Sequence, residues 1–212
     1  MKTEDKDDIE IVYWGEDEDK AVVNEAAHRR RKREYNFNLQ AEIISWIKLI
    51  GIALLVALCI NYFVIINSVV PTGSMEQTIH KKSRMIGFRL EYLFKTPERG
   101  DIIIFKFPDN EEETYVKRVV GLPGETIKIE YGIVYINGKA LEEDYVYYDS
   151  GSADLSGDFP ATYIPDNCYF VLGDNRNDSE DSRYWKTTNF VEKDKILGKA
   201  IFCYYPDLYI LH

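Results

Sequence analysis

The feature that most constrains this chain is an apolar run at residues 43–66, which reads I-I-S-W-I-K-L-I-G-I-A-L-L-V-A-L-C-I-N-Y-F-V-I-I. Lys48 is its only charged residue and lies near one end, where its stem can reach the lipid headgroups. A helix needs about 20 apolar residues to cross a bilayer, so the run predicts a transmembrane anchor. A buried core helix is one alternative. A cleavable signal peptide fits less well, because the run begins about forty residues into the chain and exceeds a usual signal-peptide core.

The charges on either side of this run predict its direction. Residues 29–33 read R-R-R-K-R, whereas no Lys or Arg follows the run until Lys81. Positive flanks stay in the cytoplasm, so we expect residues 1–42 inside the cell and residues 67–212 outside. The basic cluster can also touch anionic lipid. Residues 1–28 are strongly acidic and are interpreted as a solvated tail without chemistry of its own.

Composition argues against several classes of protein and site. The chain of 212 residues has a formal net charge of −10, which argues against nucleic acid as a partner. Its three cysteines form no C-x-x-C motif and no cluster at metal-ligand spacing, so we expect neither a metal nor another cofactor. Cys168 and Cys203 could pair only if their strands are neighbours.

After the anchor, short apolar runs separated by turn signals predict a mainly β domain. Strands are expected at I-I-I-F-K-F (102–107), T-Y-V-K-R-V-V (114–120), C-Y-F-V-L (168–172) and I-L-G-K-A-I-F-C-Y-Y (196–205). Residues 126–140 predict two more strands and a hairpin turn at Asn137-Gly138. Residues 141–164 show no clear period, and we interpret them as an irregular insertion.

Ser74 is a candidate nucleophile, because it follows the anchor closely in V-V-P-T-G-S-M-E-Q-T-I (69–79). A serine needs a base to accept its proton. Among the three histidines, His28 lies in the tail, His212 is the last residue and His80 lies in a polar, basic segment. A Ser-His-Asp triad is therefore poorly supported. A lysine can serve instead if burial lowers its pKa from about 10.4.

Lys117 is the candidate base, because it stands inside an apolar strand. On that strand Tyr115 and Lys117 share one face, while Arg118 points to the opposite one. An arginine cannot be deprotonated at workable pH, which leaves the lysine. The alternative is a solvent-facing lysine at the edge of an exposed strand.

A third unusual stretch is L-G-D-N-R-N-D-S-E-D-S-R-Y-W at residues 172–185, which crowds charges, amides and hydroxyls into a turn. A solvated polar loop is the simplest interpretation. The stretch nevertheless follows an apolar run and ends in Tyr-Trp, so we expect it to be held at both ends. Loops held in this way often carry function.

Together and in this order, these segments resemble the type I signal peptidases, the membrane-anchored serine proteases that release exported proteins from their signal peptides. The resemblance extends from the anchor nearly to Cys203. The motifs that carry it are V-P-T-G-S-M-E-Q-T-I, R-G-D-I-I-I-F-K-F-P, Y-V-K-R-V-V-G-L-P-G-E-T-I and L-G-D-N-R-N-D-S-E-D-S-R-Y-W. It implies one transmembrane helix followed by an antiparallel-sheet catalytic domain.

The resemblance implies roles for particular residues. Ser74 would be the nucleophile and Lys117 the general base. The backbone N–H of Ser74 and the hydroxyl of Thr72 would form the oxyanion hole, with Thr72 standing where many relatives have serine. Ser179 would hydrogen-bond the lysine and hold its orientation.

Three further residues are expected to support the dyad. Asp181 and Arg183 resemble an ion pair that braces the site, and Tyr115 shares the strand face of the lysine. The sequence departs from the family pattern at Asp178, where asparagine is common, and at Lys186, where glycine is usual. Neither departure removes the serine or the lysine.

By resemblance, the substrates are signal peptides with small residues at the first and third positions before the cut, cleaved at the outer face of the bilayer near the export translocon. A self-cleaving repressor of the Ser-Lys type would keep the chemistry but would be cytosolic and bind DNA. A maturation peptidase of conjugation systems would act on one dedicated substrate. A non-catalytic β domain that binds other envelope proteins would be expected to lack the serine or the lysine.

Overall fold

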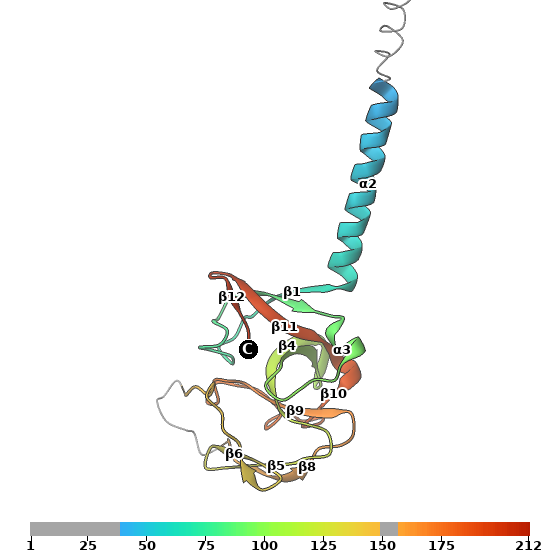
Figure 1. Cartoon of the computed structure of the whole chain (residues 1–212). Helices are drawn as coiled ribbons and strands as arrows, with labels where there is room; N and C mark the ends of the chain where they lie inside the picture. Colours follow the sequence, from blue (N-terminus) through green and yellow to red (C-terminus); the bar gives the residue numbers. More distant parts are fainter. Residues whose placement is uncertain (1–38, 149–156) are drawn as a thin grey trace, which may run out of the picture. The chain divides into compact units, whose positions relative to one another are not determined.

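The computed structural model describes residues 39–148 and 157–212 (Figure 1). Most of the expected cytoplasmic tail, including its basic cluster, lies outside the described residues, as do residues 149–156 of the expected insertion. The chain divides into two compact units, Met1–Leu55 and Val56–His212.

Helix α2 (Leu39–Phe63) contains the predicted anchor. Its 25 residues give a length of about 37 Å, which exceeds the roughly 30 Å of a bilayer hydrocarbon core. None of its side chains is buried, so the alternative of a core helix finds no support. The helix ends at Phe63, three residues before the predicted limit, because Ile65 and Ile66 belong to the first strand of the domain.

A large antiparallel sheet forms most of the unit Val56–His212 (Figure 1). The strands, in spatial order, are β1 (Ile65–Val69), β2 (Arg84–Phe88), β11 (Ile196–Tyr205), β3 (Ile102–Phe107), β4 (Asn110–Gly121), β9 (Cys168–Leu172) and β10 (Val191–Glu192). Strand β12 (Tyr209–Ile210) pairs with β11. A one-turn helix, α3 (Glu91–Phe94), connects β2 to β3, and a 3₁₀ turn, η2 (Lys193–Lys195), precedes β11.

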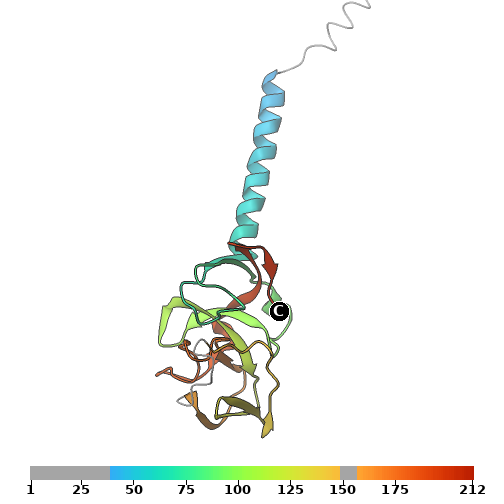
Figure 2. The same cartoon turned by 90° about the vertical axis from the view of Figure 1, so that its left-hand side faces the viewer.

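A second, smaller sheet lies at the end of this unit farther from β1 (Figures 1 and 2). Its strands, in order, are β7 (Lys139–Ala140), β6 (Ile133–Ile136), β5 (Thr126–Glu130) and β8 (Phe159–Tyr163). The prediction of an irregular insertion is wrong for β8, which pairs with β5 through Ile127 and Thr162. Because β8 is an edge strand, it tolerates Pro160, which lacks the N–H that a central strand needs.

The mainly β prediction is confirmed, and the apolar runs at 102–107, 114–120, 168–172 and 196–205 all lie in strands. The hairpin turn at Asn137-Gly138 is also present, with both residues at positive φ. Cys168 and Cys203 lie in β9 and β11, which are not neighbours in the sheet, and both thiols are free.

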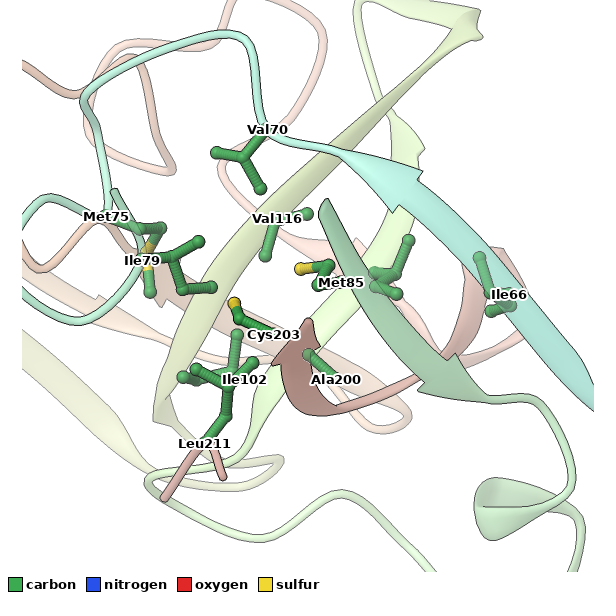
Figure 3. Packing of buried hydrophobic residues seen from close by; sticks show 11 residues of the cluster. Ile66, Val70, Met75, Ile79, Met85, Ile102, Val116, Ala200, Cys203 and Leu211 are labelled. Atoms are coloured by element: carbon green, nitrogen blue, oxygen red, sulfur yellow. The ribbon is translucent and has the colours of Figure 1, made fainter. Parts of the chain in front are cut away.

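Strand β4 contributes residues to three separate hydrophobic clusters. Val116 belongs to the first, which Figure 3 shows around Met75, Ile79 and Met85. Val119 belongs to the second cluster and Val120 to the third. The two cations between these valines are therefore carried into the core by the strand itself.

Candidate active site

Ser74 lies in the turn that connects β1 to β2, and its neighbours hold it in place. Met75 and Ile79 are fully buried in the first cluster, and they fix the chain on the C-terminal side of the serine (Figure 3). The carbonyl of Ser74 accepts a hydrogen bond of 3.1 Å from the backbone N–H of Asn175, and the amide of Asn175 donates to Gly73 O at 3.2 Å. Ser74 is only 4% exposed.

Lys117 reaches the serine from the middle of β4. Its Nζ lies 2.7 Å from Ser74 Oγ, which is hydrogen-bond distance. The strand places it by register, since Lys117 stands opposite Ile103 of β3. The side chain is 3% exposed, so the alternative of a solvent-facing edge lysine is wrong.

Burial lowers the pKa of Lys117 from its ordinary value of 10.5 to about 8. Desolvation is the main cause, because it disfavours the charged ammonium. The carboxylates of Asp181 and Glu180 act in the opposite direction and limit the shift. A substantial fraction of this lysine is therefore neutral at moderately alkaline pH, as a proton acceptor must be.

The serine and the lysine open into a cavity of about 480 Å³. Val69, Val70 and Pro71 line one part of it, and Tyr115 lies on another. Thr72 also borders this cavity, and its Oγ1 lies 3.3 Å from Ser74 Oγ. The space is large enough for a short stretch of extended polypeptide beside the two reactive groups.

Asp181 is the centre of a buried polar network in the loop that follows β9. Arg183 donates to it through Nε at 2.8 Å and Nη2 at 2.9 Å, and the carboxylate is fully buried. The Ser179 hydroxyl donates to Asp181 Oδ2 at 2.7 Å, whereas the resemblance implies a hydrogen bond to Lys117. Gly173 N donates to the same oxygen at 3.1 Å. The carboxylate thus orients Ser179 and the loop that carries it.

Gly173 is required by close packing in this loop. A Cβ built on it would lie 2.5 Å from the carbonyl oxygen of Ser74 and would also collide with the Ser179 side chain. Only a residue without a side chain lets the loop approach the nucleophile segment this closely.

A second buried ion pair was missed by the sequence analysis. Arg118 donates to Asp174 through Nε at 2.9 Å and Nη2 at 2.7 Å, and both side chains are buried. Thr78 Oγ1 donates to the same carboxylate at 2.6 Å, so Asp174 joins β4 to the segment that carries Ser74 and Thr78. Local sequence offered only a weak signal, namely an arginine inside an apolar strand.

The ring of Tyr115 lies between Phe107 and Lys117, within contact distance of both. The ring stacks on Phe107 with centroids 4.2 Å apart, and its centroid lies 5.4 Å from Lys117 Nζ. His80, by contrast, pairs with Glu76 at 2.8 Å, and its side chain is 53% exposed.

Comparisons with known proteins agree with one another. Residues 43–205 match the family described as signal peptidase, peptidase S26. The probable signal peptidase I-2 of Synechocystis sp. is 37% identical over 159 residues, which cover 73% of this chain and 69% of that protein. Signal peptidase I S of Bacillus subtilis is 35% identical over 178 residues, which cover 81% and 94% respectively.

A crystal structure of a signal peptidase I from Enterococcus faecalis is 38% identical and covers 50% of this chain and 97% of that one, with a TM-score of 0.41. The sequence matches to the family and to these two relatives are extensive. These sequence matches show that the chain is a peptidase. It belongs to the signal peptidase family, peptidase S26.

Proposed function

We propose that this chain removes signal peptides from exported preproteins with Ser74 as nucleophile and Lys117 as general base. The observation that carries the proposal is the 2.7 Å contact between Lys117 Nζ and Ser74 Oγ, both buried beside a cavity. Neutral lysine takes the hydroxyl proton as Oγ attacks the scissile carbonyl, and the resulting ammonium then protonates the leaving amine. Water hydrolyses the acyl-enzyme after the lysine has lost its proton again.

The charge that develops on the substrate oxygen needs donors in fixed positions. We assign this role to the backbone N–H of Ser74 and to the hydroxyl of Thr72, which borders the same cavity. A donor of this kind contributes about 3–4 kcal/mol of transition-state stabilisation. Thr72→Val keeps the shape of the side chain and removes the hydroxyl, so it should lower kcat with little change in folding stability.

Two free strand edges support binding of the substrate as an extended chain. In the described part of the sheet, β1 pairs only with β2, and β4 pairs with β9 only from Arg118 onwards. The cavity lies between the continuation of β1 and residues Glu113–Lys117 of β4. Unpaired backbone groups on an edge can hydrogen-bond an added strand, while side-chain pockets select its residues. Small substrate residues at the first and third positions before the cut are expected to fit here.

The apolar helix and its basic flank support a single span with the N-terminus in the cytoplasm and the catalytic domain outside. Ser74 follows Phe63 by only a short strand and turn, so the substrate can meet the enzyme while still held in the bilayer near the export translocon. External protease added to intact spheroplasts should digest residues 67–212 and spare residues 1–42. The reverse pattern of protection would overturn this orientation.

Cleavage of a purified preprotein in detergent micelles tests the chemistry. Ser74→Ala and Lys117→Met should abolish cutting, whereas Lys128→Met, at a side chain that is 42% exposed on β5 of the smaller sheet, should leave it unchanged. The N-terminus of the mature product identifies the cut. Activity that survives in Lys117→Met but is lost in His80→Ala would refute the assigned base. A wild type that cuts no member of a preprotein panel would favour a dedicated substrate.

A further inference from the structure

Helix α3 presents two large apolar side chains to the outside of the domain. Leu93 is 71% exposed and Phe94 is 85% exposed, although they are adjacent in the chain. Single apolar residues on a surface are ordinary, but such a pair on a fixed turn is a candidate contact for another apolar phase.

Tyr92, the second residue of α3, fixes the position of the turn. Tyr92 packs against the second hydrophobic cluster, and its hydroxyl donates to Asp101 Oδ2 at 2.9 Å. The same carboxylate accepts a hydrogen bond from the backbone N–H of Glu98 at 3.0 Å. Asp101 therefore fixes the segment at Tyr92 and again at Glu98. Leu93 and Phe94 point outward, and the core is packed without them.

The turn also lies close to the point where the apolar helix ends. Strand β1 begins two residues after Phe63, and its first residue, Ile65, pairs with Phe88. Arg89 N then donates to Val64 O at 2.8 Å, and α3 begins at Glu91. The chain from Arg89 to Phe94 therefore starts beside Val64, the residue between α2 and β1 at which a spanning helix would leave the bilayer.

We propose that the Leu93–Phe94 turn is a second membrane contact of the catalytic domain and inserts into the headgroup region of the leaflet at which the span ends. The flanking charges fit this partner, since Arg89 precedes the apolar pair and Lys95 follows it. Lys95 is paired with Glu91 at 2.8 Å, whereas Arg89 forms no ion pair within the described ranges. Apolar side chains bracketed by cations are typical of surfaces that enter anionic lipid.

Lipid fits better than a protein partner because the position is fixed by the chain. A residue bonded to Val64 cannot move far from the bilayer if α2 spans it, and five residues reach at most about 18 Å. The inference therefore rests on the proposed span, but it does not depend on the Ser-Lys chemistry. It adds a second point of attachment, which would limit rotation of the domain about a single helix.

Depth-dependent fluorescence quenching tests the contact in the full chain. Phe94→Trp and Tyr163→Trp are prepared in vesicles of phosphatidylglycerol and phosphatidylcholine that carry brominated acyl chains. Tyr163 is a matched control, because it is an aromatic residue with 59% exposure on β8 of the smaller sheet. The wild type carries only the native tryptophans and supplies the background for both variants, and the quenching that Trp46→Phe loses relative to wild type reports on the span itself.

The expected result is strong quenching of the tryptophan at position 94 and of Trp46, with little quenching at position 163. Quenching of Trp46 without quenching at position 94 would overturn the membrane contact and leave the span intact. Equal quenching at positions 94 and 163 would also overturn it, because the domain would then lie on lipid without a specific contact. No quenching of Trp46 would refute the span and the inference together.

Activity provides a second readout. The double variant Leu93→Ser, Phe94→Ser loses apolar area comparable to one buried side chain, so cleavage of a vesicle-bound preprotein should fall on the order of tenfold. Cleavage of a short peptide in detergent should remain at the wild-type rate. A loss in both assays would indicate damage to the fold, and an unchanged rate in both would contradict the proposal.

Discussion

The pKa of Lys117 makes the pH dependence of cleavage a direct test of the proposed dyad. Burial lowers this pKa from 10.5 to about 8, so about one tenth of the lysine is neutral at pH 7 and about nine tenths at pH 9. If the neutral amine is the base, kcat/KM should rise about tenfold between these two values. An ordinary lysine with a pKa near 10.4 would be neutral in fewer than about one molecule per thousand at pH 7.

The assay is cleavage of a soluble peptide substrate at concentrations well below KM, measured between about pH 6 and pH 10, where kcat/KM reports on the free enzyme. Circular dichroism at each pH serves as the control for folding. The expected profile rises with unit slope and levels off above a midpoint near 8. A midpoint near 6.5 that disappears in His80→Ala would identify a histidine base and refute the reasoning. A rate that still rises at pH 10 would show that the lysine is not desolvated in solution.

Three further predictions follow from the same network. Lys117→Met should inactivate the enzyme but stabilise its fold at pH 7 by at most about 3 kcal/mol, measured by thermal unfolding. The lowered pKa of the buried lysine destabilises the folded state fully below pH 8. This cost disappears as the pH rises towards 10.5, the ordinary pKa that the lysine has in the unfolded chain. Asp178→Asn should shift the acidic limb of the rate profile to lower pH, since Asp178 raises the pKa of the lysine; an unchanged limb would contradict this. Asp181→Asn should cost about 3–5 kcal/mol in chemical denaturation because Arg183 loses its buried partner, whereas the control Glu111→Gln, at an exposed ion pair, should cost less than about 1 kcal/mol.

The strands that could be predicted from sequence are those in which composition and turns agree. Strands β3 and β9 are short apolar runs bounded by Gly, Pro, Asp or Asn, and a strand needs little more to be recognised. Strand β1 was hidden because I-I-N-S-V continues the apolar run of the anchor, so hydropathy cannot separate helix from strand at Val64. Strand β8 was missed because F-P-A-T-Y has one buried residue at its start, and its pairing with β5 is a long-range contact.

The candidate site divides in a similar way. Ser74 and Lys117 could be proposed from chemistry, since a serine needs a base and a lysine within an apolar strand is a plausible one. The partners of the neighbouring groups could not, because they depend on which loop meets which strand. Arg118 is bound by Asp174, 56 positions away, and Ser179 turns to Asp181 because that carboxylate is buried beside it. Tertiary packing decides which hydrogen-bond partner each of these side chains meets, and local sequence does not predict that packing.

The two hydrogen bonds that Asn175 makes to Gly73 and Ser74 have a consequence for the time at which the proposed site can form. The hydrogen bond to Gly73 joins positions 102 residues apart, so this segment cannot be held in place until the chain has been made beyond Asn175. At about 5–20 residues per second, synthesis of that interval takes roughly 5–20 seconds. During this time Gly73 and Ser74 lack the hydrogen bonds that Asn175 supplies, and over the first 43 residues of the interval the chain also lacks Lys117. The proposed active site is therefore completed only late in synthesis, when the loop that contains Asn175 has been made.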